Sequence, residues 1–186
     1  MYPAYVRLSR VSPNKARVLL AKEATAPPVS FYSLSAELRD GSRLDFADFK
    51  NKNVLLVNTA SGCGFTEQYD QMQRLFKAFK EDLVVLAFPT NDFGEEKSND
   101  EEIAIFCREN FRVGFPIIKK GVVKKGKLQH AVFNWLTDPH KNGWNSQQPL
   151  WNFCKYLVNK EGLLIAYLGS AIEPTGDEIQ ELVTAH

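Results

Sequence analysis

The sequence predicts an α/β protein in which helices flank a central mixed β-sheet. Two continuous apolar runs, at 54–58 and 83–88, have the composition of strands buried on both faces. An amphipathic helical pattern lies between them at about 66–80, and such a strand–helix–strand unit pairs its strands in parallel. Two adjacent strands and a closing helix are expected near the C-terminus.

Length, charge and cysteine content limit the class of protein. A chain of 186 residues is expected to form one domain. Its net charge of +1 argues against a strong electrostatic dependence on nucleic acid. No run approaches the ~20 apolar residues of a transmembrane span. Three cysteines are too few for a secreted disulfide framework, so we expect a reducing, cytoplasmic location.

The N-terminus differs in composition from the rest of the chain. Residues 1–28 are expected to be a basic extension and linker, and residues 29–186 a single domain. Residues 1–22 contain Lys and Arg but no acidic residue, which indicates a solvated tail or an edge helix. An organelle presequence or a membrane-surface helix is the alternative. The Pro-containing stretch 24–28 is typical of a linker.

The remaining elements follow from turn and capping residues. An N-terminal hairpin is expected around a turn at Asp40-Gly41, and Ser98 and Glu101 have the spacing of a capping box. The expected elements are strands at 31–34 and near 44–46, helices at 99–110 and 128–137, strands at 151–157 and 163–168, and a helix from 175. This order of strands and helices is that of the thioredoxin fold.

Cys63 is the strongest candidate for chemistry. It follows the first buried strand, precedes a helix and is flanked by Gly62 and Gly64. Ligand sites gather at this position in open α/β sheets, and a helix N-terminus favours the reactive thiolate. The alternative is that Cys63 is a small buried hydrophobic residue, as most free cysteines are.

Three sequence blocks resemble motifs of the glutathione peroxidase family. They are Asn58–Thr66, Phe88–Gly94 and Trp151–Phe153, and they occur in the family's order. The resemblance covers about residues 30–184. It implies a thioredoxin-like thiol peroxidase that reduces hydrogen peroxide and organic or lipid hydroperoxides, with no cofactor.

The resemblance also implies roles for individual residues. Cys63 would attack the peroxide and become a sulfenic acid. Trp151 and Asn152 would donate hydrogen bonds to its sulfur; the alternatives are core packing for Trp151 and a turn amide for Asn152. The family's glutamine is replaced by Glu95 or by Glu96, depending on the side from which the segment is aligned. A carboxylate near the thiol would raise its pKa.

A second cysteine bears on the catalytic cycle. The segment ending at Cys107 resembles the resolving-cysteine segment of the thioredoxin-dependent branch, which implies a Cys63–Cys107 disulfide reduced by thioredoxin, with glutathione as the alternative reductant. Cys107 shares a helix face with Ile103, so plain packing is the competing interpretation. If Cys107 lies far from Cys63, a disulfide would require local unwinding of the helix. Cys154 is expected only to pack.

Other features suggest partners less directly. A lysine-rich segment is expected to be a solvated loop, or else a docking surface for an acidic reductant or lipid headgroups. Its members are Lys119, Lys120, Lys124, Lys125 and Lys127. By resemblance, the short segment 116–151 favours a monomer. His130 and His140 lack ligand spacing, so no metal site is expected. A peroxide sensor that passes a disulfide to a partner protein, and an inactive interaction protein, are the alternative functions.

Overall fold

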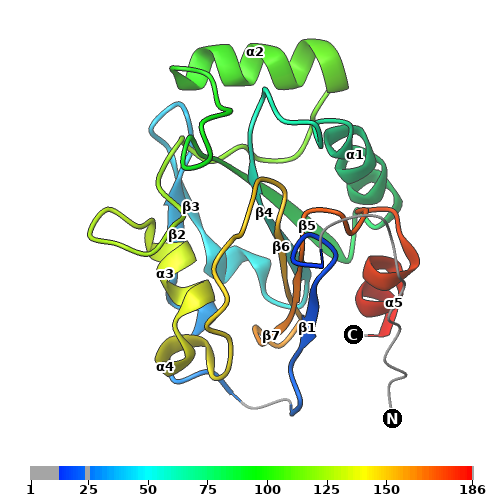
Figure 1. The fold of residues 1–186 in the computed structure, drawn as a ribbon. Coiled ribbons are helices and arrows are strands. Elements are labelled where there is room, and N and C mark those ends of the chain that lie inside the picture. The colour runs from blue at the N-terminus through cyan, green and yellow to red at the C-terminus, as the bar shows by residue number, and fades with distance from the viewer. Residues whose placement is uncertain (1–12, 24–25, 186) are drawn as a thin grey trace.

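The computed structural model describes residues 13–23 and 26–185, and its centre is a five-stranded mixed sheet (Figure 1). β4 and β5 are parallel, whereas every other neighbouring pair is antiparallel. In spatial order the strands are β1 (Val18–Leu20), β7 (Leu164–Leu168), β6 (Lys155–Val158), β4 (Asn53–Thr59) and β5 (Leu83–Pro89). The predicted mixed sheet is therefore confirmed, with the two apolar runs side by side.

The two parallel strands are buried on both faces. Along β4, Leu55 and Val57 point into one hydrophobic cluster, whereas Val54 and Leu56 point into the other. Successive side chains of a strand face opposite sides of a sheet, so an unbroken apolar run supplies both clusters at once.

Helices cover both faces of the sheet, as predicted. In Figure 1, α1 (Gln68–Ala78) and α5 (Asp177–Ala185) lie on the right, and α2 (Asp100–Phe111) lies above them. On the left are α3 (Ala131–Thr137) and α4 (Pro139–Asn142). The first of these groups contributes to the cluster that contains Cys63 and Cys107.

The predicted N-terminal hairpin is present but shorter than expected. The expected strand at 31–34 is instead a 3-10 turn, Phe31–Ser33, since Ser30 caps it by accepting from the Tyr32 N–H at 3.3 Å. The hairpin strands are β2 (Ser35–Glu37) and β3 (Arg43–Asp45). The Asp40-Gly41 turn is confirmed: Gly41 has φ 83°, which glycine adopts without strain.

Part of the predicted N-terminal extension belongs to the sheet. β1 pairs with β7, with Val18 opposite Leu168 and Leu20 opposite Ala166. A three-residue edge strand in which only Leu19 is half-buried carries too little alternation to be recognised in the sequence. Residues 1–12 of the basic extension and residues 24–25 of the linker lie outside the described residues.

The start of α2 lies one residue later than the predicted capping box. Asn99 is the N-cap, and its Oδ1 accepts from the Glu102 N–H at 2.9 Å. The Ser98 hydroxyl instead contacts the Glu102 carboxylate at 3.1 Å. Asn and Ser are about equally favourable N-cap residues, so the sequence alone does not decide whether Ser98 or Asn99 caps the helix.

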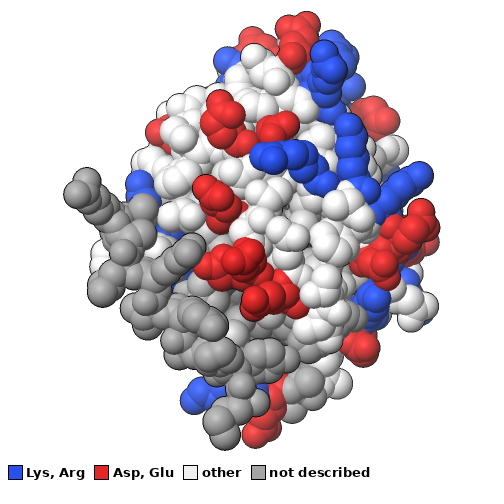
Figure 2. Space-filling view, turned by 90° about the vertical axis from the view of Figure 1, so that its right-hand side faces the viewer, with Lys and Arg blue, Asp and Glu red and all other residues white. Residues whose placement is uncertain are grey.

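Neither a membrane span nor a metal cluster is seen in the described part of the chain. No helix there is long and apolar enough to cross a bilayer. No three His, Cys, Asp or Glu side chains within residues 13–23 and 26–185 are grouped so that they could hold a metal ion. On the face shown in Figure 2, acidic and basic side chains are interspersed.

Candidate active site

Sheet topology brings the predicted site residues to one edge. The parallel strands β4 and β5 both end there, and the antiparallel strand β6 begins there. Cys63 follows β4, Glu95 follows β5, and Trp151 and Asn152 precede β6. Three loops that are distant in sequence therefore meet around one thiol.

The segment from Trp151 to Phe153 is a tight turn, so the prediction of a strand from residue 151 is wrong. Phe153 has φ 61°, a left-handed conformation that ends extended structure. Asn58 holds the turn: its carbonyl accepts from the Phe153 N–H at 2.6 Å, and its Nδ2 donates to the Trp151 carbonyl at 2.9 Å. Because this is not a strand, Trp151 and Asn152 need not face opposite sides of the sheet.

Cys63 is a buried thiol between two exposed glycines. Its side chain is 5% exposed, and its Sγ accepts from the Phe65 N–H at 3.5 Å. Gly62 donates its N–H to the Glu95 carbonyl at 2.8 Å. A Cβ at Gly62 would lie 3.0 Å from that oxygen, so glycine allows the Glu95 loop to approach the thiol.

The pKa of Cys63 is raised, contrary to the expectation from the helix N-terminus. Burial is the largest cause; the Phe65 N–H opposes it, Glu95 adds to it, and the Trp151 indole N–H opposes it more weakly. α1 begins only at Gln68, so Cys63 precedes the helix and lies outside its first turn. The helix dipole acts mainly within that turn and has little effect on the thiol. The resting thiol is therefore held in its protonated form.

The two glutamates occupy different positions. Glu95 lies beside the thiol, and its Oε2 accepts from Asn152 Nδ2 at 2.9 Å, so Asn152 donates to a carboxylate. Glu96 instead accepts from the backbone N–H groups of Ser61 at 3.0 Å and Lys97 at 2.7 Å. Burial raises the pKa of Glu96. Of the two alignments, the one with Glu95 at the glutamine position matches this geometry.

Replacing Glu95 with Gln is expected to lower the pKa of Cys63. The change removes a negative charge and supplies an N–H donor, so more thiolate is present at neutral pH. Alkylation by iodoacetamide at pH 7 should become roughly threefold faster or more, with its pH profile displaced to lower pH. Glu96→Gln is the matched control and should leave that profile in place. An unchanged or upward-displaced profile for Glu95→Gln would contradict the assignment.

A buried lysine supports the Trp151–Phe153 turn. Lys155 is 0% exposed, and its Nζ donates to the carbonyls of Phe153 at 2.8 Å and Ser170 at 3.2 Å. These bonds join the turn to the segment after β7. Burial lowers the pKa of Lys155 to about 7, although the charges of Cys154 and Glu173 act in the opposite direction.

Lys155 should make stability increase with pH. Between the folded pKa of about 7 and the unfolded value of 10.5, the unfolded chain holds a proton that the folded chain has released. From pH 7 to pH 9 the free energy of unfolding should therefore gain about 2 kcal/mol more in the wild type than in Lys155→Met. Urea denaturation at both pH values measures this. The exposed Lys22→Met is the control, and equal gains in all three proteins would refute the prediction.

Cys107 is buried in the same hydrophobic cluster as Cys63. It is 0% exposed and shares its helix face with the equally buried Ile103, as predicted. Burial is the main cause that raises its pKa to about 11, and the nearby Tyr69 hydroxyl acts in the lowering direction. All three cysteines are free, so this is the reduced state of the chain.

Cys154 lies away from the site. It belongs to the opposite hydrophobic cluster, where the Tyr167 hydroxyl lies 3.3 Å from its Sγ. The packing role expected for it fits this position.

The lysine-rich segment is tied to the body of the protein. Lys119 pairs with Glu37 at 2.8 Å, and Lys124 donates to the Asp92 carbonyl at 2.8 Å. Asp92 accepts two backbone N–H groups of this segment, those of Val123 and Lys124. These contacts favour a structured loop over a free docking surface.

Two residues that shape the site, Asn58 and Lys155, have roles that the sequence did not predict. Asn58, at the end of an apolar run, and Lys155, in an otherwise apolar strand, are polar residues at positions where solvent is absent. Buried polar groups need partners, so such interruptions are the signal that could have found them.

The fold and site together define a thioredoxin-like thiol oxidoreductase. Cys63 follows the parallel strand β4, at the edge of the sheet where the Trp151 indole N–H and the Glu95 carboxylate converge on its thiol. The solved structure described as Trgpx in apo form is similar, with a TM-score of 0.65 and 32% identity, over 84% of this chain and 95% of that chain.

Sequence comparison identifies the family. The glutathione peroxidase family model matches residues 31–137. Glutathione peroxidase-like peroxiredoxin 2 of Saccharomyces cerevisiae is 37% identical, over 83% of this chain and 98% of the relative. The hydroperoxy fatty acid reductase of Synechocystis sp. is 38% identical, over 81% and 91%. The chain belongs to the glutathione peroxidase family, which confirms the resemblance and the predicted fold.

Proposed function

We propose that the protein is a thiol peroxidase and that Cys63 carries its reaction. The Cys63 sulfur attacks the O–O bond of a hydroperoxide; one oxygen becomes the sulfenic acid, and the other leaves as alcohol or water with the thiol proton. The observation that carries this proposal is a single thiol at the meeting point of Trp151, Asn152 and Glu95. In this role Trp151 stabilises the thiolate, and Glu95 positions Asn152.

Cys107 completes the proposed cycle. Its thiol attacks the sulfenic acid, forms a Cys63–Cys107 disulfide and releases water. Because Cys107 is fully buried on α2, this step includes local unwinding of the helix at its C-terminal end. The C-cap there, Arg112, is a non-glycine residue at φ 51°, a conformation that costs free energy, and the end is held by the Arg112 N–H to the Arg108 carbonyl at 3.0 Å and the Val113 N–H to the Cys107 carbonyl at 3.3 Å.

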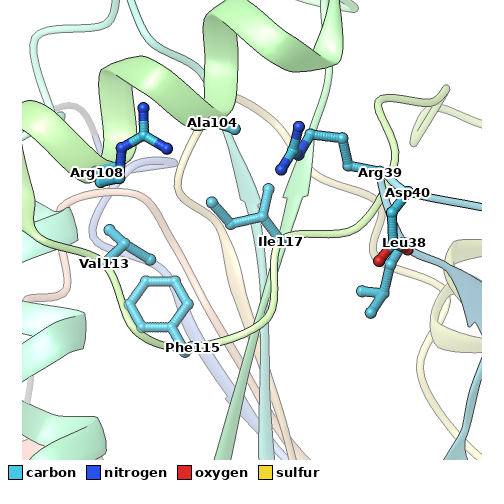
Figure 3. Close-up of a pocket in the computed structure, with 8 residues that line it drawn as sticks. All are labelled: Leu38, Arg39, Asp40, Ala104, Arg108, Val113, Phe115 and Ile117. Atoms are coloured by element: carbon cyan, nitrogen blue, oxygen red, sulfur yellow. The ribbon is translucent and has the colours of Figure 1, made fainter. Parts of the chain in front are cut away.

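An open groove beside α2 is consistent with this opening. The groove has a volume of about 280 Å³. Figure 3 shows Ala104 and Arg108 on its helix side. Phe115 and Ile117 line the facing wall. A helix with few contacts on one side loses less packing energy when its last turn unwinds.

We infer that a dithiol reductant of the thioredoxin type, rather than glutathione, closes the cycle. An intramolecular disulfide is reversed by one dithiol, which becomes a disulfide itself. Hydrogen peroxide turnover should be compared with thioredoxin and glutathione side by side. Clearly faster turnover with thioredoxin is expected, and faster turnover with glutathione would overturn the two-cysteine cycle.

Substrate range, location and assembly complete the proposal. The Synechocystis relative is named as a hydroperoxy fatty acid reductase, which supports organic and lipid hydroperoxides as substrates besides hydrogen peroxide. The small and odd number of cysteines, three, favours a reducing compartment such as the cytoplasm. We also propose that residues 29–186 act as one monomeric domain, with residues 13–20 docked on its edge.

A further inference from the structure

A lysine of the N-terminal segment lies at the mouth of the site. The Lys15 ammonium lies over the rings of Trp151, 5.2 Å from the centroid, and Phe65, 5.5 Å from the centroid. Both aromatic residues adjoin the Cys63 thiol: Trp151 through its indole N–H and Phe65 through its backbone N–H. Lys15 precedes residues 31–137, which the family model matches, so it belongs to a part of the chain outside that model.

The backbone around Lys15 is fixed against the sheet. The Lys15 carbonyl accepts from the Ala171 N–H at 2.8 Å, and the Arg17 carbonyl accepts from the Gly169 N–H at 2.7 Å. A Cβ at Gly169 would lie only 2.3 Å from the Lys15 carbonyl oxygen, so glycine is required for the two segments to cross there. Pairing of β1 with β7 continues this attachment. The ammonium is therefore held near the site by the fold.

The mouth of the site combines an apolar surface with positive charge. Phe93 contacts Trp151 with a ring separation of 5.4 Å, so Phe65, Trp151 and Phe93 form a half-buried aromatic rim. A second ammonium, that of Lys124, lies 4.3 Å from the Phe93 ring centroid. Among the residues that the structure describes, Lys15 makes no ion pair.

We propose that Lys15 is a specificity-determining residue that binds the carboxylate of hydroperoxides carried on an apolar chain. The substrate class is the free-acid form of fatty acid hydroperoxides. The acyl chain folds over the aromatic rim, so that its carboxylate contacts Lys15 and its hydroperoxyl group reaches Cys63 beside Trp151. This inference rests on the proposed peroxidase function and adds the residue that selects the charged, free-acid form of such substrates.

Lys15→Gln tests the proposal with one negatively charged substrate and two uncharged ones. These are linoleic acid hydroperoxide, its uncharged methyl ester and hydrogen peroxide. At low ionic strength, kcat/KM for the free acid should fall about threefold to tenfold, mainly through KM, whereas the values for ester and hydrogen peroxide stay unchanged. Added salt should reduce the wild-type preference for the free acid. Lys22→Gln makes the same charge change on an exposed residue of the same segment and should leave the preference intact.

The outcomes separate this inference from the proposed function. If the ratio of kcat/KM for the free acid to kcat/KM for the ester is unchanged in Lys15→Gln, and hydrogen peroxide turnover is normal, the role of Lys15 is overturned but the proposed function stands. An equal loss for all three substrates would also overturn it, because it would indicate a general disturbance of the site. If the wild type consumes no peroxide at all, the proposed function fails, and the inference fails with it.

Discussion

Cys63→Ser is expected to abolish peroxide consumption, with a loss of at least about a thousandfold. A serine hydroxyl is not ionised at neutral pH and cannot form a sulfenic acid, so the remaining site has no group that breaks the O–O bond. The assay is the disappearance of hydrogen peroxide with reductant in excess.

Cys154→Ser is the matched control for this experiment. It makes the same chemical change in a buried cysteine of the opposite hydrophobic cluster. Its hydroxyl can pair with Tyr167 and Ser170, which already contact the sulfur. Near-normal turnover is expected in Cys154→Ser. Substantial turnover by Cys63→Ser, or equal losses in both variants, would refute the assignment of the nucleophile.

Cys107→Ser should separate the two halves of the cycle. The first equivalent of peroxide should still be consumed, because Cys63 is intact, but thioredoxin-driven turnover should fall at least about a hundredfold. The intramolecular attack that resolves the sulfenic acid is lost, and only slower bimolecular reactions remain. A sulfenic acid at Cys63 should then accumulate and be trapped by dimedone.

A packing defect would give a different result. Cys107 is buried against the core, so its replacement with serine also places a hydroxyl there. Ile103→Val perturbs the same helix face without touching a thiol and should retain thioredoxin-driven turnover. If Cys107→Ser turns over with thioredoxin as the wild type does, Cys107 only packs.

The sequence predicted the secondary structure correctly where burial leaves a clear pattern of apolar residues. The runs forming β4 and β5, the helix between them and the position of Cys63 all follow from local composition. The geometry around Trp151 does not, because the turn at Phe153 depends on hydrogen bonds to Asn58, more than ninety positions earlier in the chain. The sequence around residues 151–157 has the composition of a strand, so it predicts a strand that begins too early.

Which of two glutamates lies beside the Cys63 thiol depends on how the loops assemble, and the sequence alone does not decide it. Glu95 and Glu96 are adjacent and chemically alike, and contacts between the assembled loops decide which of them faces Cys63. Asn152 donates to the Glu95 carboxylate, whereas Ser61 donates its N–H to Glu96. Lys15 is a similar case. Its place on the aromatic rim depends on Gly169 in a distant turn and on a three-residue edge strand.

The most direct test of the central claim is the intact mass and peptide map of the reduced protein after one equivalent of hydrogen peroxide. The account predicts the loss of two hydrogen atoms and a single Cys63–Cys107 cross-linked peptide pair, with Cys154 still free. In Cys107→Ser the gain of one oxygen at Cys63 should replace that loss. No mass change at Cys63 in either protein, or a disulfide that involves Cys154 instead, would contradict the account.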